Sequence, residues 1–219
     1  MKHAVVTDLV RSVSVSTAAG DHTALVRACS AWPAERLVAL LSAPTIDVVS
    51  AAVIALGVKG STEVVPDLVG LLAQPDPRFV EKVEDSLFAI WMRAGTPNAN
   101  HLLADAVRCI REENYREADE ILAELVRAEP GFAEPHHQRG IALAMLEEYP
   151  AAEREFVSAL EWNIWHYSAA ANLGHARVQL DDFHGALEAY QTALRIHPTL
   201  AGMSETLAAV RALLQQQVT

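Results

Sequence analysis

The amino-acid sequence predicts an all-α fold, a solenoid of helical hairpins, and three observations lead to this prediction. Residues 99–200 contain one pattern three times at a constant spacing. Residues 1–98 repeat at a different and shorter spacing. In both stretches apolar residues recur at i, i+3 and i+4, which indicates helices. Such repeats, with small residues at fixed offsets, indicate stacked helical hairpins that bury their apolar faces against one another.

The first stretch, residues 1–98, is expected to form three hairpins at about 2–29, 33–57 and 62–93. Four of its positions recur in the same order one repeat later: Leu37, Leu40, Leu41 and Pro44 become Leu68, Leu71, Leu72 and Pro75. Helix breakers suit these bounds, because Pro33 can open a helix, Gly57 can close one and Thr62 can cap the next. From Asp47-Val48 to Ala55-Leu56-Gly57 the sequence resembles short HEAT-like repeats of the PBS-lyase type.

The second stretch is a domain expected at 99–219, with repeats at 99–132, 133–166 and 167–200 and a capping helix at 201–217. Three sets of residues hold one register through the repeats: Tyr115, Tyr149 and Phe183; Ala118, Ala152 and Ala186; and Leu122, Phe156 and Tyr190. The capping helix places Leu207, Val210, Leu213 and Leu214 on one side. The turn formers at 94–98 are too few for a flexible linker, so the two arrays are expected to stack into one body with a shared core.

At these residues the sequence resembles the tetratricopeptide repeat family, whose pattern is W-x2-L-G-x2-Y, then A-x3-F, then P. The third repeat fits best, with Leu173-Gly174, Ala186, Tyr190 and Pro198. The other two repeats depart from the pattern at different places: Arg139 and Ile164 replace the leucine and the proline in the second, and Asp105-Ala106 replaces Leu-Gly in the first. No repeat carries the tryptophan.

Composition and charge exclude several classes of protein. The longest apolar runs are far shorter than the roughly 20 residues of a membrane helix, and the N-terminus lacks a secretory pattern, so a cytoplasmic protein without membrane insertion is expected. Cys29 and Cys109 are expected to be buried thiols. The formal net charge is −11, and residues 99–219 hold 9 basic against 18 acidic residues. This charge argues against nucleic acid binding.

The acidic residues gather on the second helix of the first tetratricopeptide-like repeat: Glu112, Glu113, Glu117, Glu120 and Glu124. We interpret them as the solvated outside of the solenoid, and the alternative is a docking surface for a basic partner. The sequence leaves the oligomeric state open.

Catalytic, metal and cofactor sites are not expected. The sequence has no dinucleotide, phosphate-loop, nucleophile-elbow or H-E-x-x-H motif. HEAT-like enzymes include bilin lyases and a di-iron hydroxylase with His-Glu pairs, yet no histidine here precedes a glutamate. Nine histidines raise the question of zinc, but no pair in the last two repeats has ligand spacing within one helix. His136 takes the place of the packing tryptophan. Trp162 is expected to pack and Trp165 to be exposed in its loop.

The expected function is a scaffold or adaptor that binds a partner protein or peptide. The resemblance implies that the first helix of each hairpin lines a concave groove, and the residues placed there are His137, Gln138, Ile141, Met145, Asn172, His175 and Gln179. Burial of these residues against neighbouring helices is the alternative. Some family members grip a C-terminal carboxylate with lysine, asparagine and arginine, where this chain has Leu103, Val107, Gln138, Ala171 and His175. A secretion or assembly chaperone is the main alternative function, and a lyase-type enzyme subunit is a further one.

Overall fold

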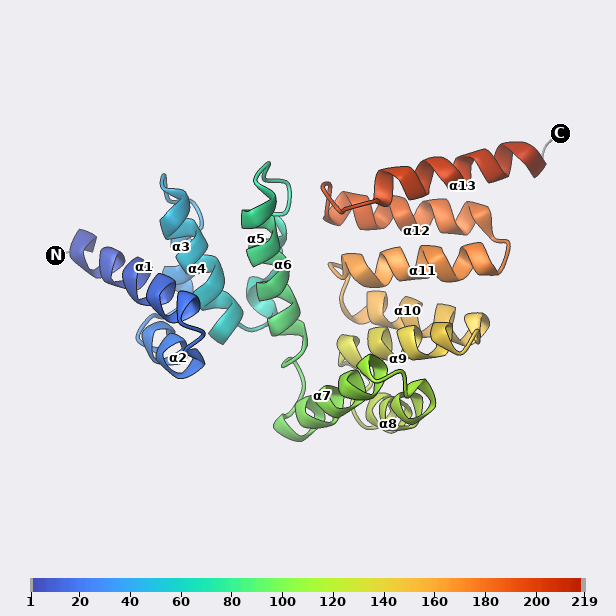
Figure 1. Cartoon of the computed structure of the whole chain (residues 1–219), viewed down its shortest axis with the longest axis horizontal. Coiled ribbons are helices and arrows are strands. Elements are labelled where there is room, and N and C mark those ends of the chain that lie inside the picture. The colour runs from blue at the N-terminus through green and yellow to red at the C-terminus, as the bar shows by residue number, and fades with distance from the viewer. Residues whose placement is uncertain (1, 218–219) are drawn as a thin grey trace. The chain divides into compact units, whose positions relative to one another are not determined.

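A computed structural model of the chain describes residues 2–217, with side chains from residue 6 to residue 215 (Figure 1). Every regular element in that range is helical, with 13 α-helices and one short 3-10 helix, so the prediction of an all-α fold of helical hairpins is confirmed. The chain divides into two compact units, one ending at Trp91 and one beginning at Met92. The boundary predicted at residue 98, and a core shared by the two arrays, stay predictions.

The first unit contains three pairs of helices that coincide with the three predicted hairpins. They are α1 (Lys2–Ala18) with α2 (His22–Ser30), α3 (Ala34–Leu40) with α4 (Ile46–Lys59), and α5 (Val65–Val69), which follows a 3-10 turn at Thr62–Val64, with α6 (Pro77–Trp91). Helix α4 is apolar on nearly every side because it is the centre of this unit, in contact with α1, α2, α3 and α6.

Two expected helix boundaries in the first unit are wrong. Gly57 does not end its helix, because α4 continues to Lys59. It is a packing glycine instead: a Cβ there would lie 2.6 Å from Ser86 Oγ on α6. The cap of the next turn is Ser61 and not Thr62, since the Ser61 hydroxyl accepts the N–H of Glu63. The sequence is compatible with Gly57 either ending the helix or packing against a neighbour, and the close approach of α6 shows that it packs.

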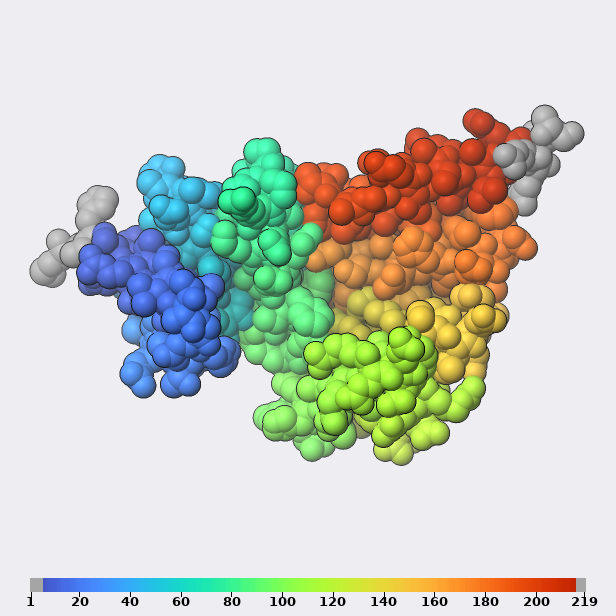
Figure 2. Space-filling view, viewed as in Figure 1, coloured from blue at the N-terminus to red at the C-terminus, as the bar shows by residue number. Residues whose placement is uncertain are grey.

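The second unit is a regular solenoid. Its helices are α7 (Pro97–Arg111), α8 (Tyr115–Ala128), α9 (Ala133–Met145), α10 (Tyr149–Trp162), α11 (Tyr167–Gln179), α12 (Phe183–Ile196) and α13 (Met203–Gln217). Each helix packs on the next, and α9 also contacts both α7 and α11. Helix α13 covers α12 and buries Met203, Leu207 and Val210, as expected of a capping helix (Figure 2).

The turn inside each hairpin of the second unit has the same backbone geometry. Glu113, Glu147 and Asp181 occupy the same position in successive repeats and adopt φ of 63°, 62° and 58°. In each case the following N–H reaches back to the helix, for example from Glu148 N to Leu143 O at 2.9 Å. This is the Schellman pattern, which normally uses glycine at the left-handed position. Here an acidic residue occupies it three times.

The glycines of the second and third hairpins lie where two helices approach most closely. A Cβ on Gly140 would lie 2.5 Å from the Phe156 ring, and one on Gly174 would lie 2.4 Å from the Tyr190 ring. The first hairpin has Ala106 at this position, and its partner in the same buried cluster is Leu122. Leu122 leaves room for the Ala106 methyl group, whereas an aromatic ring at residue 122 would fill that space.

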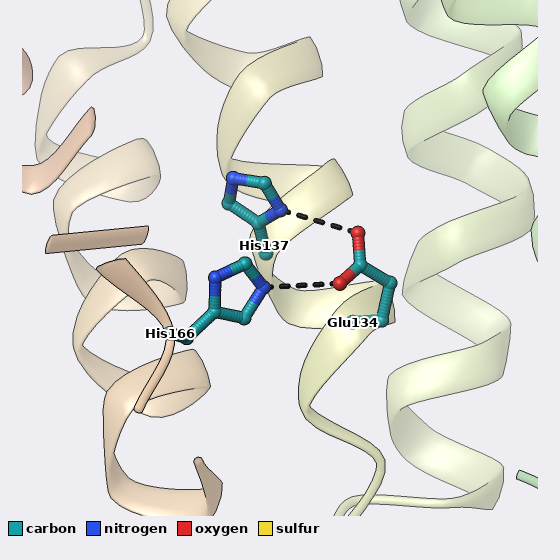
Figure 3. Close-up of side chains that lie close together, drawn as sticks. All are labelled: Glu134, His137 and His166. Carbon is teal, nitrogen blue, oxygen red and sulfur yellow. Dashed lines mark hydrogen bonds and ion pairs between the residues drawn. The ribbon is translucent and has the colours of Figure 1, made fainter. Parts of the chain in front are cut away.

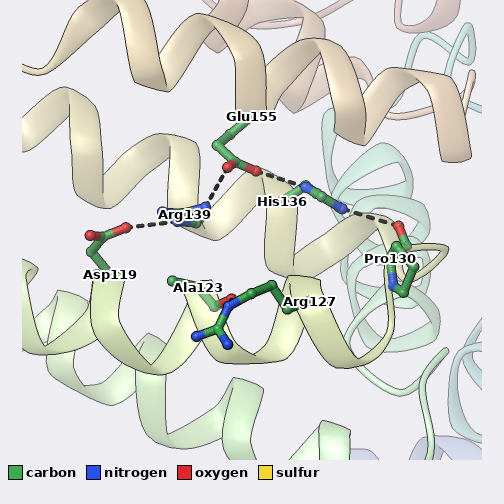
Figure 4. A network of polar contacts seen from close by, with 7 residues as sticks. All are labelled: Asp119, Ala123, Arg127, Pro130, His136, Arg139 and Glu155. Atoms are coloured by element: carbon green, nitrogen blue, oxygen red, sulfur yellow. Dashed lines mark hydrogen bonds and ion pairs between the residues drawn. The ribbon is translucent and has the colours of Figure 1, made fainter.

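Polar contacts join consecutive hairpins of the second unit. Arg139 on α9 donates to Asp119 on α8 at 2.7 Å and to Glu155 on α10 at 2.6 Å (Figure 4). Glu155 also pairs with His136 Nδ1 at 2.7 Å, and His136 Nε2 lies 3.1 Å from the Pro130 carbonyl oxygen. Both departures from the repeat pattern, His136 and Arg139, therefore belong to one network spanning three helices.

Candidate functional site

A hollow of about 230 Å³ lies between α9 and α11 in the second unit, with α10 behind it. Its lining residues are Ile141, Ala144, Met145, Tyr149, Phe156, Asn172, His175, Ala176 and Gln179. Five of the seven residues predicted to bind a partner are in this set: Ile141, Met145, Asn172, His175 and Gln179. The helical register brings them together because residues 141 and 145, and residues 172, 175 and 179, are each one turn apart on their own helix.

The hollow is apolar at its base and open at its rim. Phe156 and Ala176 are buried, whereas the Met145 side chain is 55% exposed. None of the lining residues carries a formal charge at neutral pH. Methionine is a flexible, polarizable side chain that adapts to different apolar partners. The lining therefore suits an uncharged, apolar group.

His175 contributes a polar edge to the hollow. Its Nδ1 lies 2.8 Å from the Tyr190 hydroxyl, so Tyr190 fixes the ring from behind. Burial lowers the pKa of His175 and raises the pKa of Tyr190 to about 12. Both groups are therefore neutral near pH 7, and the histidine offers a hydrogen-bonding atom without a charge.

His137 and Gln138, the other two predicted residues, lie elsewhere. They are only 6% and 7% exposed, and both contact the carboxylate of Glu134. Figure 3 shows this carboxylate between His137 and His166. Glu134 Oε1 accepts from Gln138 Nε2 at 2.7 Å and from His137 Nδ1 at 3.2 Å, and Oε2 lies 3.0 Å from His166 Nε2. The structure thus gives His137 and Gln138 partners inside the protein. Glu134 is a central residue of this cluster that the sequence analysis missed.

The electrostatics of the cluster keep Glu134 ionised. Burial alone would raise the pKa of the Glu134 carboxyl, but the hydrogen bonds from His137 and His166 outweigh it and hold the pKa well below its usual range. Burial lowers the pKa of His166, and the nearby Glu134 opposes this only in part. The cluster is thus a buried carboxylate that accepts hydrogen bonds from several side chains, an arrangement that makes a buried charge tolerable.

The same three residues, Glu134, His137 and His166, bring their ligand atoms within 4.8 Å of one another, which is close enough to consider a metal ion. A second hydrogen bond argues against it. His166 Nδ1 accepts the backbone N–H of Ala169 at the start of α11, so the proton of a neutral ring is on Nε2. A metal at Nε2 would displace this proton to Nδ1, where it would face the Ala169 N–H. The arrangement fits a hydrogen-bonded cluster better than a metal centre.

The two tryptophans near the end of α10 are placed oppositely to the prediction. Trp162 is 58% exposed, whereas Trp165 is half-buried. The reason is local: the Trp162 ring lies over Gly131, which offers no side chain to cover it. The Trp165 N–H is held by the Asn163 side chain at 3.1 Å, which turns the loop inward. Ile164, in the same loop, is 66% exposed.

The acidic residues on and before α8 lie on the surface as expected. Glu112, Glu113, Glu117, Glu120 and Glu124 are all exposed. Within residues 2–217 no helix combines the length and the apolar character needed to cross a bilayer.

No protein-family profile and no curated protein matches the chain. Solved structures do. The first tetratricopeptide domain of Spaghetti (RPAP3), bound to the HSP90 peptide SRMEEVD, matches with a TM-score of 0.54 and 21% identity over 55% of this chain and 96% of that one. The first such domain of human RPAP3 gives 0.52 and 21% over 54% and 93%. The Sgt2 domain of Aspergillus fumigatus gives 0.53 and 18% over 56% and 82%.

These similarities cover little more than half of the chain, so the HEAT-like interpretation of residues 1–98 stays a prediction. Their sequence identities are low, and what they establish is the fold. The chain contains a helical-hairpin solenoid with the fold of tetratricopeptide repeat domains.

Proposed function

We propose that this protein is a non-catalytic interaction module that holds a segment of a partner protein in the hollow between α9 and α11. The observation that supports it is the uncharged hollow itself, formed by residues one turn apart on two neighbouring helices. Its volume of about 230 Å³ is below the roughly 300–1,000 Å³ of pockets that enclose small-molecule ligands. An anchoring apolar side chain of a peptide fits this size better than a metabolite does.

The chemistry of the lining supports a binding role over a catalytic one. Tyr149 and His175 are the titratable groups among the lining residues, and His175 is hydrogen-bonded to the phenol of Tyr190. A hydrolase or transferase would need a nucleophile hydrogen-bonded to a base, with a third group to orient that base. The lining shows no such arrangement. The fold alone would not decide this, because one fold serves many functions.

The partner is not expected to end in the acidic tail seen in the RPAP3 complex. Binding of two carboxylates needs nearby cations or free N–H donors. At the corresponding positions Leu103 and Ala171 are buried, and the Gln138 amide already donates to Glu134. We therefore expect no measurable binding of the peptide SRMEEVD by isothermal titration. Micromolar affinity would contradict this expectation.

The experiment that tests the proposal uses a peptide selected on the full chain from a random display library, labelled for fluorescence polarisation. Ile141→Glu places a charge in the apolar lining and should weaken binding at least roughly 30-fold, the effect of losing an interface hot spot. Asn172→Ala should weaken it less. Neither variant should change the helical content or the melting temperature beyond a few degrees.

Ile164→Glu is the matched control, since it is the same substitution at a residue that is 66% exposed and outside the hollow. It should leave the affinity unchanged. If Ile141→Glu binds as the wild type does, the proposed site is wrong. If Ile164→Glu abolishes binding instead, the surface around Trp162 and Ile164 is the binding site.

A further inference from the structure

The hydrogen bonds behind the hollow converge on the carboxylate of Glu134, and we infer from them that Asn172 presents its carbonyl oxygen to the bound segment. The segment must then supply an N–H donor beside its apolar anchor. This inference rests on the proposed function of the hollow and specifies its ligand. It also gives Glu134, His137 and His166 a common role as positioning residues, although none of the three lines the hollow.

The direction of the His166 hydrogen bonds is set at a backbone amide. The N–H of Ala169 can only donate, and it lies 3.3 Å from His166 Nδ1, which is therefore unprotonated. A neutral imidazole with a free Nδ1 carries its proton on Nε2, and this atom lies 3.0 Å from Glu134 Oε2. The carboxylate of Glu134 can only accept, so the proton between them belongs to His166.

The hydrogen bonds of His137 and Asn172 follow from the same carboxylate. Because Glu134 accepts, His137 must donate from Nδ1 across 3.2 Å. His137 Nε2 lies 3.1 Å from the Asn172 amide nitrogen, which can only donate, so Nε2 is the acceptor. The Asn172 oxygen in that place would face a lone pair. The orientation of the Asn172 amide is thus determined by the hydrogen bonds that lead from the Glu134 carboxylate through His137.

The oxygen of Asn172 is the atom left for a ligand. Among the described residues it has no hydrogen-bond partner, and it is not among the buried unsatisfied atoms, so it remains accessible. A pocket that offers an acceptor selects strongly against ligands that cannot donate to it. A carboxylate would be rejected for the same reason, which agrees with the absence of basic residues in the lining.

His175, another polar residue of the lining, does not have a fixed donor or acceptor role. Its partner Tyr190 carries a hydroxyl that can both donate and accept, so His175 can present either a proton or a lone pair at Nε2. The hollow therefore combines the fixed acceptor of Asn172 with an adaptable group. An extended peptide has this complementary pattern, with an apolar side chain next to backbone N–H and C=O groups.

The first test measures which ring nitrogens of His137 and His166 carry protons, without any ligand. In long-range proton–nitrogen spectra of the full chain labelled with 15N-histidine, protonated and unprotonated ring nitrogens separate clearly. We expect the proton on Nδ1 in His137 and on Nε2 in His166. A proton on Nε2 of His137 would reverse the Asn172 amide and overturn the inference, while the proposed function would be unaffected.

The second test uses three small probes with the same isobutyl group: N-methylisovaleramide, which has one N–H donor, N,N-dimethylisovaleramide, which has none, and isovalerate. Titrations are followed through the backbone amide signals of α9 and α11. The donor probe should bind roughly tenfold more tightly than the dimethyl probe, as expected for one hydrogen bond to a desolvated acceptor. Isovalerate should bind most weakly.

Two variants make the second test specific. Asn172→Leu removes the acceptor and should abolish the preference for the N–H probe. Gln179→Leu removes another amide from the lining, but Gln179 takes no part in the hydrogen bonds from Glu134 to Asn172, so the preference should persist. Equal binding of both amide probes by the wild type would overturn the inference and leave the proposed function standing. If no probe shifts the signals of α9 and α11, the proposed site itself is contradicted.

Discussion

The first two hairpins of the solenoid unit pack in the same way but with different chemistry. In α7–α8 the interface is apolar, with Leu103, Ala106, Cys109, Leu122 and Leu125 in one buried cluster. The equivalent contact of α9 with α10 is mostly apolar too, with Leu143, Ala152 and Phe156 in one cluster. Buried polar groups adjoin it, among them Glu134, His136 and His166. The backbone geometry is nevertheless the same, with helices that keep one register from repeat to repeat.

This difference shows that the repeat fixes the positions of side chains and leaves their chemistry open. An apolar interface tolerates small rearrangements, whereas a buried carboxylate requires every donor to stay in place. The polar hairpin is therefore expected to be the more rigidly specified of the two and the more sensitive to single substitutions. It also borders the candidate binding site, where fixed geometry is useful.

The largest effect should follow from removing the carboxylate. Glu134→Ala leaves His137, His166 and Gln138 without their common acceptor and should lower the free energy of unfolding by about 3–5 kcal/mol. Glu124→Ala, an exposed glutamate on α8, is the matched control and should stay within about 0.5 kcal/mol. Urea denaturation of both variants measures the difference. A loss below about 1 kcal/mol for Glu134→Ala would mean that the two hairpins are equally tolerant.

The next largest effect should be a loss of stability at acidic pH, because the polar hairpin contains buried titratable groups. His166 has a lowered pKa in the folded state, so below its ordinary value of 6.5 the unfolded chain binds more protons and stability falls as the pH falls. One such proton changes the free energy of unfolding by at most about 1.4 kcal/mol per pH unit. The lowered pKa of Glu134 adds a further loss below its ordinary value of 4.5.

Denaturation at each pH should be compared in two variants. His166→Asn keeps an acceptor for the Ala169 N–H and should reduce the dependence above pH 5, leaving the part that His175 contributes through its own lowered pKa. His184→Gln, at an exposed histidine, should leave the dependence unchanged. A wild-type slope in His166→Asn would assign the pH dependence to groups other than His166.

A smaller effect should come from the glycine of the second hairpin. Gly140→Ala forces a methyl group into the Phe156 ring and should cost about 1–2 kcal/mol, because overpacking exceeds the gain in helix propensity. In a Phe156→Leu background, which imitates the first hairpin, the same substitution should cost nothing or stabilise. A double-mutant cycle measures this coupling. Additive effects would show that ring and glycine are independent.

The smallest expected effect is a gain. Glu147 has a φ of 62°, and in this region a residue with a Cβ is less stable than glycine by about 1 kcal/mol. Glu147→Gly should therefore raise the free energy of unfolding by about 0.5–1 kcal/mol. Glu148→Gly, one residue further along and not left-handed, should not stabilise. If both variants are destabilised equally, an interaction of the Glu147 side chain outweighs the strain.

The sequence predicted much of the fold because register and breakers are local properties. The repeated residues Tyr115, Tyr149 and Phe183 each begin a helix, and α13 begins at Met203, two residues after the predicted start. The polar cluster was not predictable in the same way, because it joins Glu134 to His166, which are far apart in sequence and on separate elements. A search for ligand pairs within one helix could not find it. The acidic residues at 113, 147 and 181 carried a visible signal, since they recur at the same place in each repeat.

The candidate site was predicted in part for the same reason. Ile141, Met145, Asn172, His175 and Gln179 were predicted from the groove positions that the resemblance to tetratricopeptide repeats implies, and the structure places all five around one hollow. His137 has equally suitable spacing, yet its direction depends on the buried Glu134 one turn before it. The exposures of Trp162 and Trp165 were predicted the wrong way round, because Trp162 lies over Gly131 of the previous loop, which has no side chain to cover the ring.

The arginines between hairpins have a consequence for how such an array can be rearranged. Asp119 and Glu153 occupy equivalent positions of successive repeats, and each pairs with an arginine on the next helix. The two arginines, Arg139 and Arg177, are not equivalent, because the position that corresponds to Arg139 holds Leu173 and Arg177 comes one helical turn later. The second and third hairpins can therefore replace one another in this contact, but the first cannot, because it has Asp105 and Cys109 at the two arginine positions. A copy of the first hairpin placed after another would face its acidic residue without an arginine, so these contacts specify which hairpin comes first.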